Sequence, residues 1–240
     1  MTGSNGGGDV HVLPGELRHA RDVRAMTEAA GLQVPSYGSY YRAGGGDDFN
    51  IVLDTAEALG APNVRIWAGS VGSAEADEAM RISIAEEIRR IAELSKRRGI
   101  GLSLEFHDGT LADTETSSVS LIRSIASDNV SLYWQPRIAV SPQSNLSTLA
   151  AFLPWLSNVH VFHYDMQRMH RPLEAGEAEW RAYVDALKRS GKPRYALLEF
   201  VKDGEAEQFL KDARTLKKIS WIRQRDRVGS LAARVFAGSR

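Results

Sequence analysis

From residue 32 onward, the chain alternates between two hydrophobic patterns. Short, nearly continuous apolar runs are followed, a few residues later, by stretches in which apolar residues recur every three or four positions. Such runs are typical of buried parallel strands, and the recurring stretches are typical of amphipathic helices. Six strands are predicted, over residues 32–41, 63–67, 101–106, 130–134, 159–163 and 195–201.

The helices are predicted from apolar stripes that end at a stop signal. The longest covers residues 75–98, where Ile84, Ile88 and Ile91 share one face and Gly99 follows a basic last turn. Together with the strands, the other stripes complete a repeating strand–helix order. They cover residues 47–59 and 114–126 and lie around residues 146–153, 180–187 and 209–216.

This repeating order predicts an α/β fold with a parallel sheet. The loops after the strands are longer and richer in polar and aromatic residues than the loops after the helices, which favours a TIM (β/α) barrel. A doubly wound open sheet is the competing architecture, but neither Gly-rich phosphate-loop motif occurs in the chain. We expect one domain over residues 1–240, with a core over about 9–220 and a basic tail at 221–240.

Composition narrows the functional classes. Lys and Arg total 30, as do Asp and Glu, so no net charge attracts nucleic acid or an anionic membrane. The absence of Cys excludes disulfides and thiolate chemistry. No apolar run approaches the ~20 residues of a membrane span, and the first residues lack the apolar core of a signal peptide. We therefore expect a cytoplasmic protein that acts on a small molecule, with no nucleic-acid or membrane partner.

Three predicted strands carry a residue near their carboxyl end that can bind a metal ion, namely Glu105, His163 and Glu199. The carboxyl ends of parallel strands meet on one face, so we expect these side chains to converge. Two carboxylates and one imidazole are suited to a divalent cation. Alternatively, each glutamate pairs with an arginine. The arginines available for such pairs are Arg65, Arg137 and Arg194.

Five short motifs follow one another in the order of the predicted strands. They are Ala58-Leu-Gly-Ala-Pro-Asn-Val-Arg65, Leu104-Glu-Phe-His-Asp-Gly-Thr110, Tyr133-Trp-Gln-Pro136, Val161-Phe-His163 and Leu197-Leu-Glu-Phe200. In their order and spacing, the chain resembles the xylose isomerase-like TIM-barrel superfamily over most of its length. That superfamily includes sugar-phosphate isomerases and epimerases and the endonuclease IV-like proteins.

The resemblance implies a particular set of metal ligands. In that family a divalent metal is held by a Glu, an Asp or Glu, a His and a Glu, and here Glu105, His163 and Glu199 match three of these positions. The acidic position falls on Gln135, whose amide oxygen can ligate but brings no charge. We therefore expect weaker binding or a different metal preference. One imidazole among oxygen ligands favours Mn²⁺, Mg²⁺ or Co²⁺ over Zn²⁺.

The predicted strands match only part of the family's barrel. Family members begin with two strands that are not recognisable here, so the six predicted strands would correspond to strands three to eight. Such a sheet has two open edges, because only a closed barrel pairs every strand. We expect that the chain starts upstream of residue 1, closes differently, or pairs with a partner, for example a second copy in a homo-oligomer.

A metal at this site would polarise a substrate carbonyl, and a glutamate on each side could remove and return a proton at the next carbon. We therefore predict an isomerase or epimerase of a sugar or keto-sugar, with Glu105 and Glu199 as acid/base pair and ligands. One alternative is a related lyase or dehydratase of a keto-sugar or inositol derivative. Another is a non-catalytic sugar-binding relative, favoured by Gln135 and the missing strands. The zero net charge and only 6 His disfavour an abasic-site nuclease.

Several other side chains near strand ends are predicted to bind substrate, because aromatic walls suit sugar rings. Ordinary packing or a loop contact is the alternative for each of them. The predicted residues are His107, Tyr37, Trp67, Trp134 and Arg168. His160 is out of phase with His163, and we interpret it as a core or helix-facing histidine.

Overall fold

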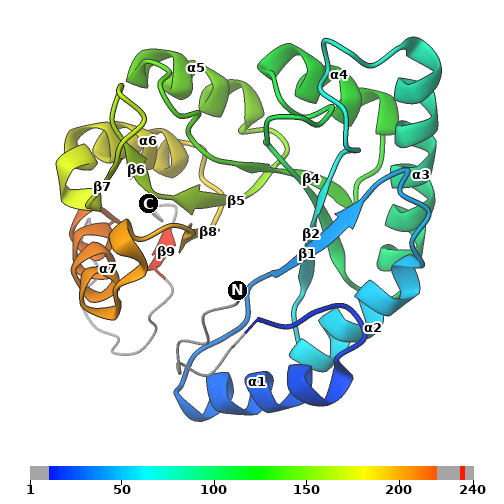
Figure 1. The fold of residues 1–240 in the computed structure, drawn as a ribbon, viewed down its shortest axis with the longest axis horizontal. Coiled ribbons are helices and arrows are strands. Elements are labelled where there is room, and N and C mark those ends of the chain that lie inside the picture. Colours follow the sequence, from blue (N-terminus) through cyan, green and yellow to red (C-terminus); the bar gives the residue numbers. More distant parts are fainter. Residues whose placement is uncertain (1–10, 221–232, 236–240) are drawn as a thin grey trace, which may run out of the picture.

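Six parallel strands form one curved sheet, a half-barrel with helices on its outer side (Figure 1). The computed structural model describes residues 11–220 and 233–235. The predicted barrel-type α/β fold with six parallel strands is confirmed. In their order across the sheet, the strands are β1 Tyr37–Arg42, β2 Asn63–Trp67, β3 Gly101–Glu105, β4 Val130–Trp134, β5 Leu156–Val161 and β8 Arg194–Leu198.

Helices connect consecutive strands and follow the outer side of the sheet (Figure 1). Several of them begin where a side chain caps free backbone N–H groups, as when Asp77 accepts from Met80 N and Thr114 accepts from Ser117 N. The α-helices are α1 Leu17–Ala29, α2 Phe49–Leu59, α3 Glu78–Arg97, α4 Glu115–Ile125, α5 Pro142–Phe152, α6 Glu177–Arg189 and α7 Ala206–Ser220. None of them is long and apolar enough to cross a membrane.

The sheet has an apolar face and a polar face. Leu102 and Leu104 are fully buried beneath the helices, whereas Ser103, between them, faces the inner side. There the Ser103 hydroxyl lies 2.9 Å from that of Ser157 on β5, although β4 separates the two strands in the sheet. The curvature therefore brings side chains from alternate strands together on the inner face, as in a closed barrel.

Several elements were not anticipated from the sequence. In helix α1 only Ala20 is buried, so the sequence there lacks the apolar stripe from which a helix is predicted. Strands β6 His163–Tyr164 and β7 His170–Arg171 form a small antiparallel hairpin after β5. Short 3-10 helices follow β7 (η1, Leu173–Gly176) and β8 (η2, Lys202–Gly204).

The two edges of the sheet differ. Strand β1 pairs with β2 alone among the described strands, whereas β8 has β5 on one side and the antiparallel strand β9, Ala233–Val235, on the other. Strand β9 belongs to the predicted basic tail at 221–240. The rest of that tail, like residues 1–10, lies outside the described residues.

Candidate functional site

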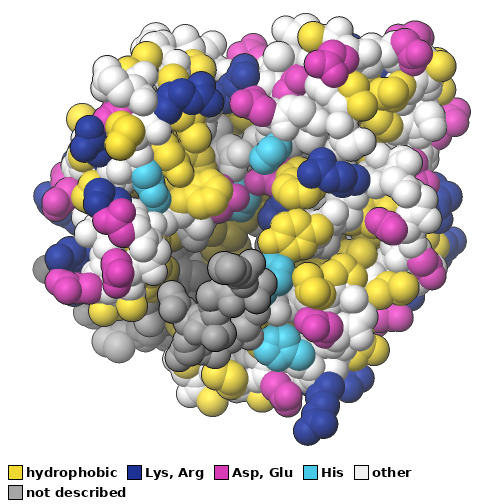
Figure 2. Space-filling view, in the orientation of Figure 1, with side chains coloured by type: hydrophobic (Ala, Val, Ile, Leu, Met, Phe, Trp, Pro, Cys, Tyr) yellow, Lys and Arg dark blue, Asp and Glu magenta, His cyan; other side chains and the backbone are white. Residues whose placement is uncertain are grey.

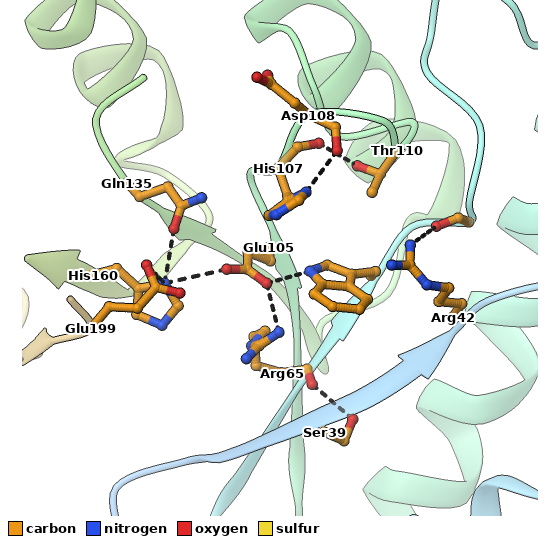
Figure 3. A network of polar contacts seen from close by, with 12 residues as sticks. Ser39, Arg42, Arg65, Glu105, His107, Asp108, Thr110, Gln135, His160 and Glu199 are labelled. Atoms are coloured by element: carbon orange, nitrogen blue, oxygen red, sulfur yellow. Dashed lines mark hydrogen bonds and ion pairs between the residues drawn. The ribbon is translucent and has the colours of Figure 1, made fainter. Parts of the chain in front are cut away.

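Three metal-capable side chains meet on the inner face of the half-barrel (Figure 3). Glu105, His160 and Glu199 each offer one ligand atom, and these atoms lie within 4.8 Å of one another. His160 Nδ1 lies 3.3 Å from Glu105 Oε1 and 3.2 Å from Glu199 Oε2. The amide oxygen of Gln135 lies 3.0 Å from the same nitrogen.

The strands fix this arrangement. Glu105 is the last residue of β3, His160 lies in β5, and Gln135 follows the last residue of β4. Glu199 directly follows β8, and its backbone N–H donates to the Val161 carbonyl at 3.2 Å, which extends the pairing of β8 with β5. The group therefore rests on two strands and on the residues that directly follow two others.

The two oxygens of Glu105 have different partners. Oε2 accepts from Arg65 Nη1 at 2.6 Å and from Trp67 Nε1 at 2.5 Å, both donors coming from β2 (Figure 3). Oε1 points instead toward His160. Glu105 is 1% exposed, so these contacts replace the water that a carboxylate would otherwise bind.

The contacts within the group set its protonation. Burial alone would raise the pKa of Glu105, but the neighbouring His160 and the Arg65 guanidinium outweigh it, so this pKa lies below its usual value. Burial alone would lower the pKa of His160, yet the Glu105 and Glu199 carboxylates raise it above its usual value. The Tyr133 ring lies 4.5 Å from the His160 ring, and burial raises the pKa of its phenol.

The side chains fit a divalent cation. Glu199 Oε2 is buried and has no hydrogen-bond partner among the described residues, since its contact with His160 lacks hydrogen-bond geometry. Two carboxylates, one imidazole and an amide oxygen form a mainly oxygen donor set, which suits Mg²⁺, Mn²⁺ or Co²⁺. The net negative charge of this donor set is small, because Gln135 is neutral and the Arg65 guanidinium offsets the charge of the Glu105 carboxylate.

The comparisons with known proteins identify the family of the chain. The family model for the xylose isomerase-like TIM barrel matches residues 6–224. The chain belongs to this family. A search of curated proteins finds no match.

Solved structures in the xylose isomerase-like TIM barrel class share the fold at low sequence identity. A xylose isomerase-like TIM barrel protein from Mycobacterium smegmatis, in complex with magnesium, is 19% identical with a TM-score of 0.63, and the match covers 88% of this chain and 80% of that one. The probable 3-DHS dehydratase AsbF from Bacillus anthracis is 18% identical with a TM-score of 0.65, covering 83% of this chain and 79% of that one. The 3-keto-D-glucoside 4-epimerase from E. coli is 14% identical with a TM-score of 0.66, covering 84% and 85%.

The prediction that His163 supplies the imidazole of this family's site differs from the structure, which does not bring His163 into the group. It lies in β6, with Nδ1 4.0 Å from Glu179 Oε2 and its ring against Gly176, where a Cβ atom would overlap it. The predicted strand at 159–163 was placed too late, because β5 ends at Val161. His160, interpreted as a core or helix-facing residue, faces the inner side instead.

Three residues predicted to bind substrate lie away from the group. Trp134 is fully buried against α6, with its ring 5.2 Å from that of Tyr183, because its place in β4 points it to the helices. Tyr37 is buried at the start of β1, and its hydroxyl donates to the Val12 carbonyl at 3.0 Å. Arg168 is exposed in the turn between β6 and β7.

Trp67 and His107 do lie beside the group. Trp67 donates to Glu105, and its ring stands 5.4 Å from that of His107 (Figure 3). In the space-filling view, histidine and hydrophobic side chains gather around the centre of this face (Figure 2). Arg65 was predicted only as an alternative partner for a glutamate, and the structure shows that pair with Glu105.

Proposed function

We propose that this chain is a divalent-metal-dependent isomerase or epimerase that moves a proton next to the carbonyl of a sugar or keto-sugar. The observation that carries the proposal is the buried group Glu105, His160 and Glu199, which combines a cation-binding donor set with two carboxylates. A bound divalent ion would polarise the substrate carbonyl and acidify the neighbouring C–H.

The two glutamates would have different roles in the proton transfer. Glu199, whose Oε2 lacks a hydrogen-bond partner among the described residues, would take the proton from the substrate carbon. Returning it to the neighbouring carbon gives isomerisation, and protonation of the same carbon from the opposite face gives epimerisation. Glu105, held by Arg65 and Trp67, is the more rigid ligand and the second acid/base group.

The substrate we propose is a small, sugar-like molecule bound between this group and the Trp67 ring. Aromatic faces suit the C–H faces of a sugar, and the polar groups of the site suit its hydroxyls. The E. coli relative is a 3-keto-D-glucoside 4-epimerase, which supports a keto-sugar as the first class to test. Because the similar IOLI protein is described with a bound zinc atom, Zn²⁺ belongs in the metal screen beside Mn²⁺, Mg²⁺ and Co²⁺.

A dehydratase is the second candidate. The same proton removal, followed by loss of a hydroxyl from the β-carbon, would release water and leave an unsaturated ketone. The similarity to a probable 3-DHS dehydratase favours including this reaction. Both candidates share the first proton transfer, so one experiment tests them together and the product separates them.

The test is solvent exchange at the substrate carbon. The protein would be incubated in D₂O with each metal and a panel of ketoses and 3-keto-sugars, and the C–H signals followed by NMR. We expect deuterium at the carbon next to the carbonyl in one substrate, with an isomer, an epimer or an unsaturated product. Exchange that persists in chelator would contradict the metal requirement, and no exchange anywhere in the panel would favour a binding protein.

Matched glutamate variants test whether the proton transfer needs Glu199, as a ligand or as a base. Glu199→Gln should lose at least about a hundredfold in exchange rate, since general acid–base catalysis typically contributes this much. Glu179→Gln is the control, because Glu179 is a glutamate near His163 and outside the group. Equal rates in the Glu199→Gln variant and the wild type would refute this assignment.

A further inference from the structure

Arg65 places a positive charge directly beside the group proposed to bind the metal. We infer that the buried positive charge of Arg65 orients Glu105 toward the metal and lowers the metal affinity of the site. The inference rests on the proposed function, because it assumes that a divalent ion binds at Glu105, His160 and Glu199. Arg65 is thus a positioning residue that acts through Glu105.

The two carboxylate oxygens of Glu105 have different roles. Arg65 Nη1 and Trp67 Nε1 both donate to Oε2, at 2.6 Å and 2.5 Å. Oε1 is left to face His160 Nδ1 at 3.3 Å. A carboxylate held at one oxygen by two donors presents the other oxygen in a fixed direction, so a cation meets one available oxygen from Glu105.

The fold leaves room for the Arg65 side chain beside Glu105. Gly38 on β1 faces the guanidinium, and a Cβ atom there would lie 2.9 Å from Arg65 Nη2. The Arg65 side chain is only 13% exposed, and its Nε is buried without a hydrogen-bond partner among the described residues. Little water therefore screens its charge, and that charge acts strongly on its neighbours.

The positive charge of Arg65 offsets part of the negative charge at the site. Glu105 and Glu199 bring two negative charges, Gln135 brings none, and Arg65 returns one positive charge. With His160 neutral, the net charge facing a divalent ion is one negative unit. Removing the arginine charge while keeping a donor for Glu105 would double that attraction. Even at the dielectric constant of water, about 80, one unit charge roughly 5 Å from a divalent ion changes its affinity by about tenfold, and the lower effective dielectric of a buried site makes the change larger.

The test is Mn²⁺ binding to the full chain, measured by titration calorimetry. Arg65→Gln removes the charge and keeps an N–H donor, which avoids leaving the buried Glu105 without a partner. We expect its Mn²⁺ dissociation constant to fall at least about tenfold relative to the wild type. Arg65→Lys keeps the charge, so its affinity should stay near that of the wild type.

Arg42→Gln is the matched control. The Arg42 guanidinium stacks on the same Trp67 ring at 4.0 Å, but it donates to the Gly69 carbonyl and not to Glu105. Its removal should change Mn²⁺ affinity much less than that of Arg65. Circular dichroism and a thermal melt of each variant would verify that it is folded before the titration.

The outcomes separate this inference from the proposed function. Tighter binding in Arg65→Gln alone supports the inference, including the case in which only this variant binds Mn²⁺ measurably. Equal or weaker binding in Arg65→Gln, beside a wild type that binds, overturns the role of Arg65 and leaves the proposed metal site standing. No Mn²⁺ binding in any variant overturns both. A purely structural arginine would not raise the affinity when it is lost.

Discussion

The two glutamates of the site differ in how much of each carboxylate is available. The Glu105 side chain is 2% exposed and has Oε2 bound by two donors, whereas that of Glu199 is 21% exposed. Glu199 Oε2 has no hydrogen-bond partner in the described part of the chain. At the residue scale, this asymmetry favours Glu105 as a fixed ligand and Glu199 as the group that exchanges protons with substrate.

A matched pair of histidine variants tests which imidazole belongs to the site. His160→Asn should lose most of the stabilisation by Mn²⁺, because it removes the nitrogen that faces both carboxylates. His163→Asn should keep it, since His163 lies beside Glu179 and Gly176 instead. The measurement is the shift in melting temperature with excess Mn²⁺. The reverse pattern would restore the ligand set predicted from the sequence.

The pH dependence of stability follows from His160. Its pKa is raised in the fold, so without metal it contributes stability that is complete below the unfolded value of about 6.5 and is lost as pH rises through the folded pKa. A metal ion competes with that proton, so its affinity should increase over the same range. Melts between about pH 6 and pH 8 should therefore show metal-free stability falling and the Mn²⁺ shift growing. Parallel curves with and without Mn²⁺ would contradict this linkage.

The sequence contained a signal for His160 that the predicted strand end obscured. In β3, Leu102 and Leu104 face the helices while Glu105 is on the inner face. Applied to β5, the same alternation sends Val159 and Val161 to the helices and His160 inward. Ending the strand at His163 made that histidine its last residue, whereas the structure brings His160 to the group. The sequence suggests Arg65 as a possible partner of a glutamate, but only the pairing of β2 with β3 brings it to Glu105.

At the scale of elements, the apolar runs predicted the strands more accurately than the other patterns predicted their elements. Strands β2 and β4 have the predicted bounds, because each is a short apolar run with clear breaks on both sides. Helix α1 and the hairpin of β6 and β7 were missed, since the first is mainly polar and each strand of the hairpin has two residues. Strand β9 was missed because its pairing depends on β8, far away in sequence.

Strand β9 should stabilise the edge of the sheet. It pairs antiparallel with β8 through Arg194, Tyr195 and Ala196. Ending the chain after residue 232 removes these pairings, and at about 1 kcal/mol for each net hydrogen bond the melting temperature should fall by roughly 3–10 °C. The exposed edge of β8 should also promote self-association, which light scattering after size-exclusion chromatography would detect.

A shorter truncation serves as the control for β9. Ending the chain after residue 235 keeps every described residue of β9 and should leave the melting temperature close to that of the full chain. If both truncations melt alike, the pairing of β9 with β8 contributes little to stability.

At the scale of the whole molecule, the site joins parts of the half-barrel that no single strand pairing connects. Its three groups come from β3, from β5 and from the residue after β8, and these lie within four adjacent strands of the sheet, β3, β4, β5 and β8. An ion that binds only the folded chain at about a hundred times its dissociation constant should add roughly 2.7 kcal/mol of stability. For a chain of this size, the melting temperature should rise by roughly 5–10 °C.

The decisive comparison is between the wild type and Glu199→Gln, each melted in chelator and then in excess Mn²⁺. Because Glu199 is the ligand contributed from β8, its loss should remove most of the shift while the metal-free protein still melts cooperatively. An equal shift in both proteins would mean that Mn²⁺ binds elsewhere. A broad melt that sharpens only with Mn²⁺ would mean that the ion makes the strands from β3 to β8 unfold as one unit.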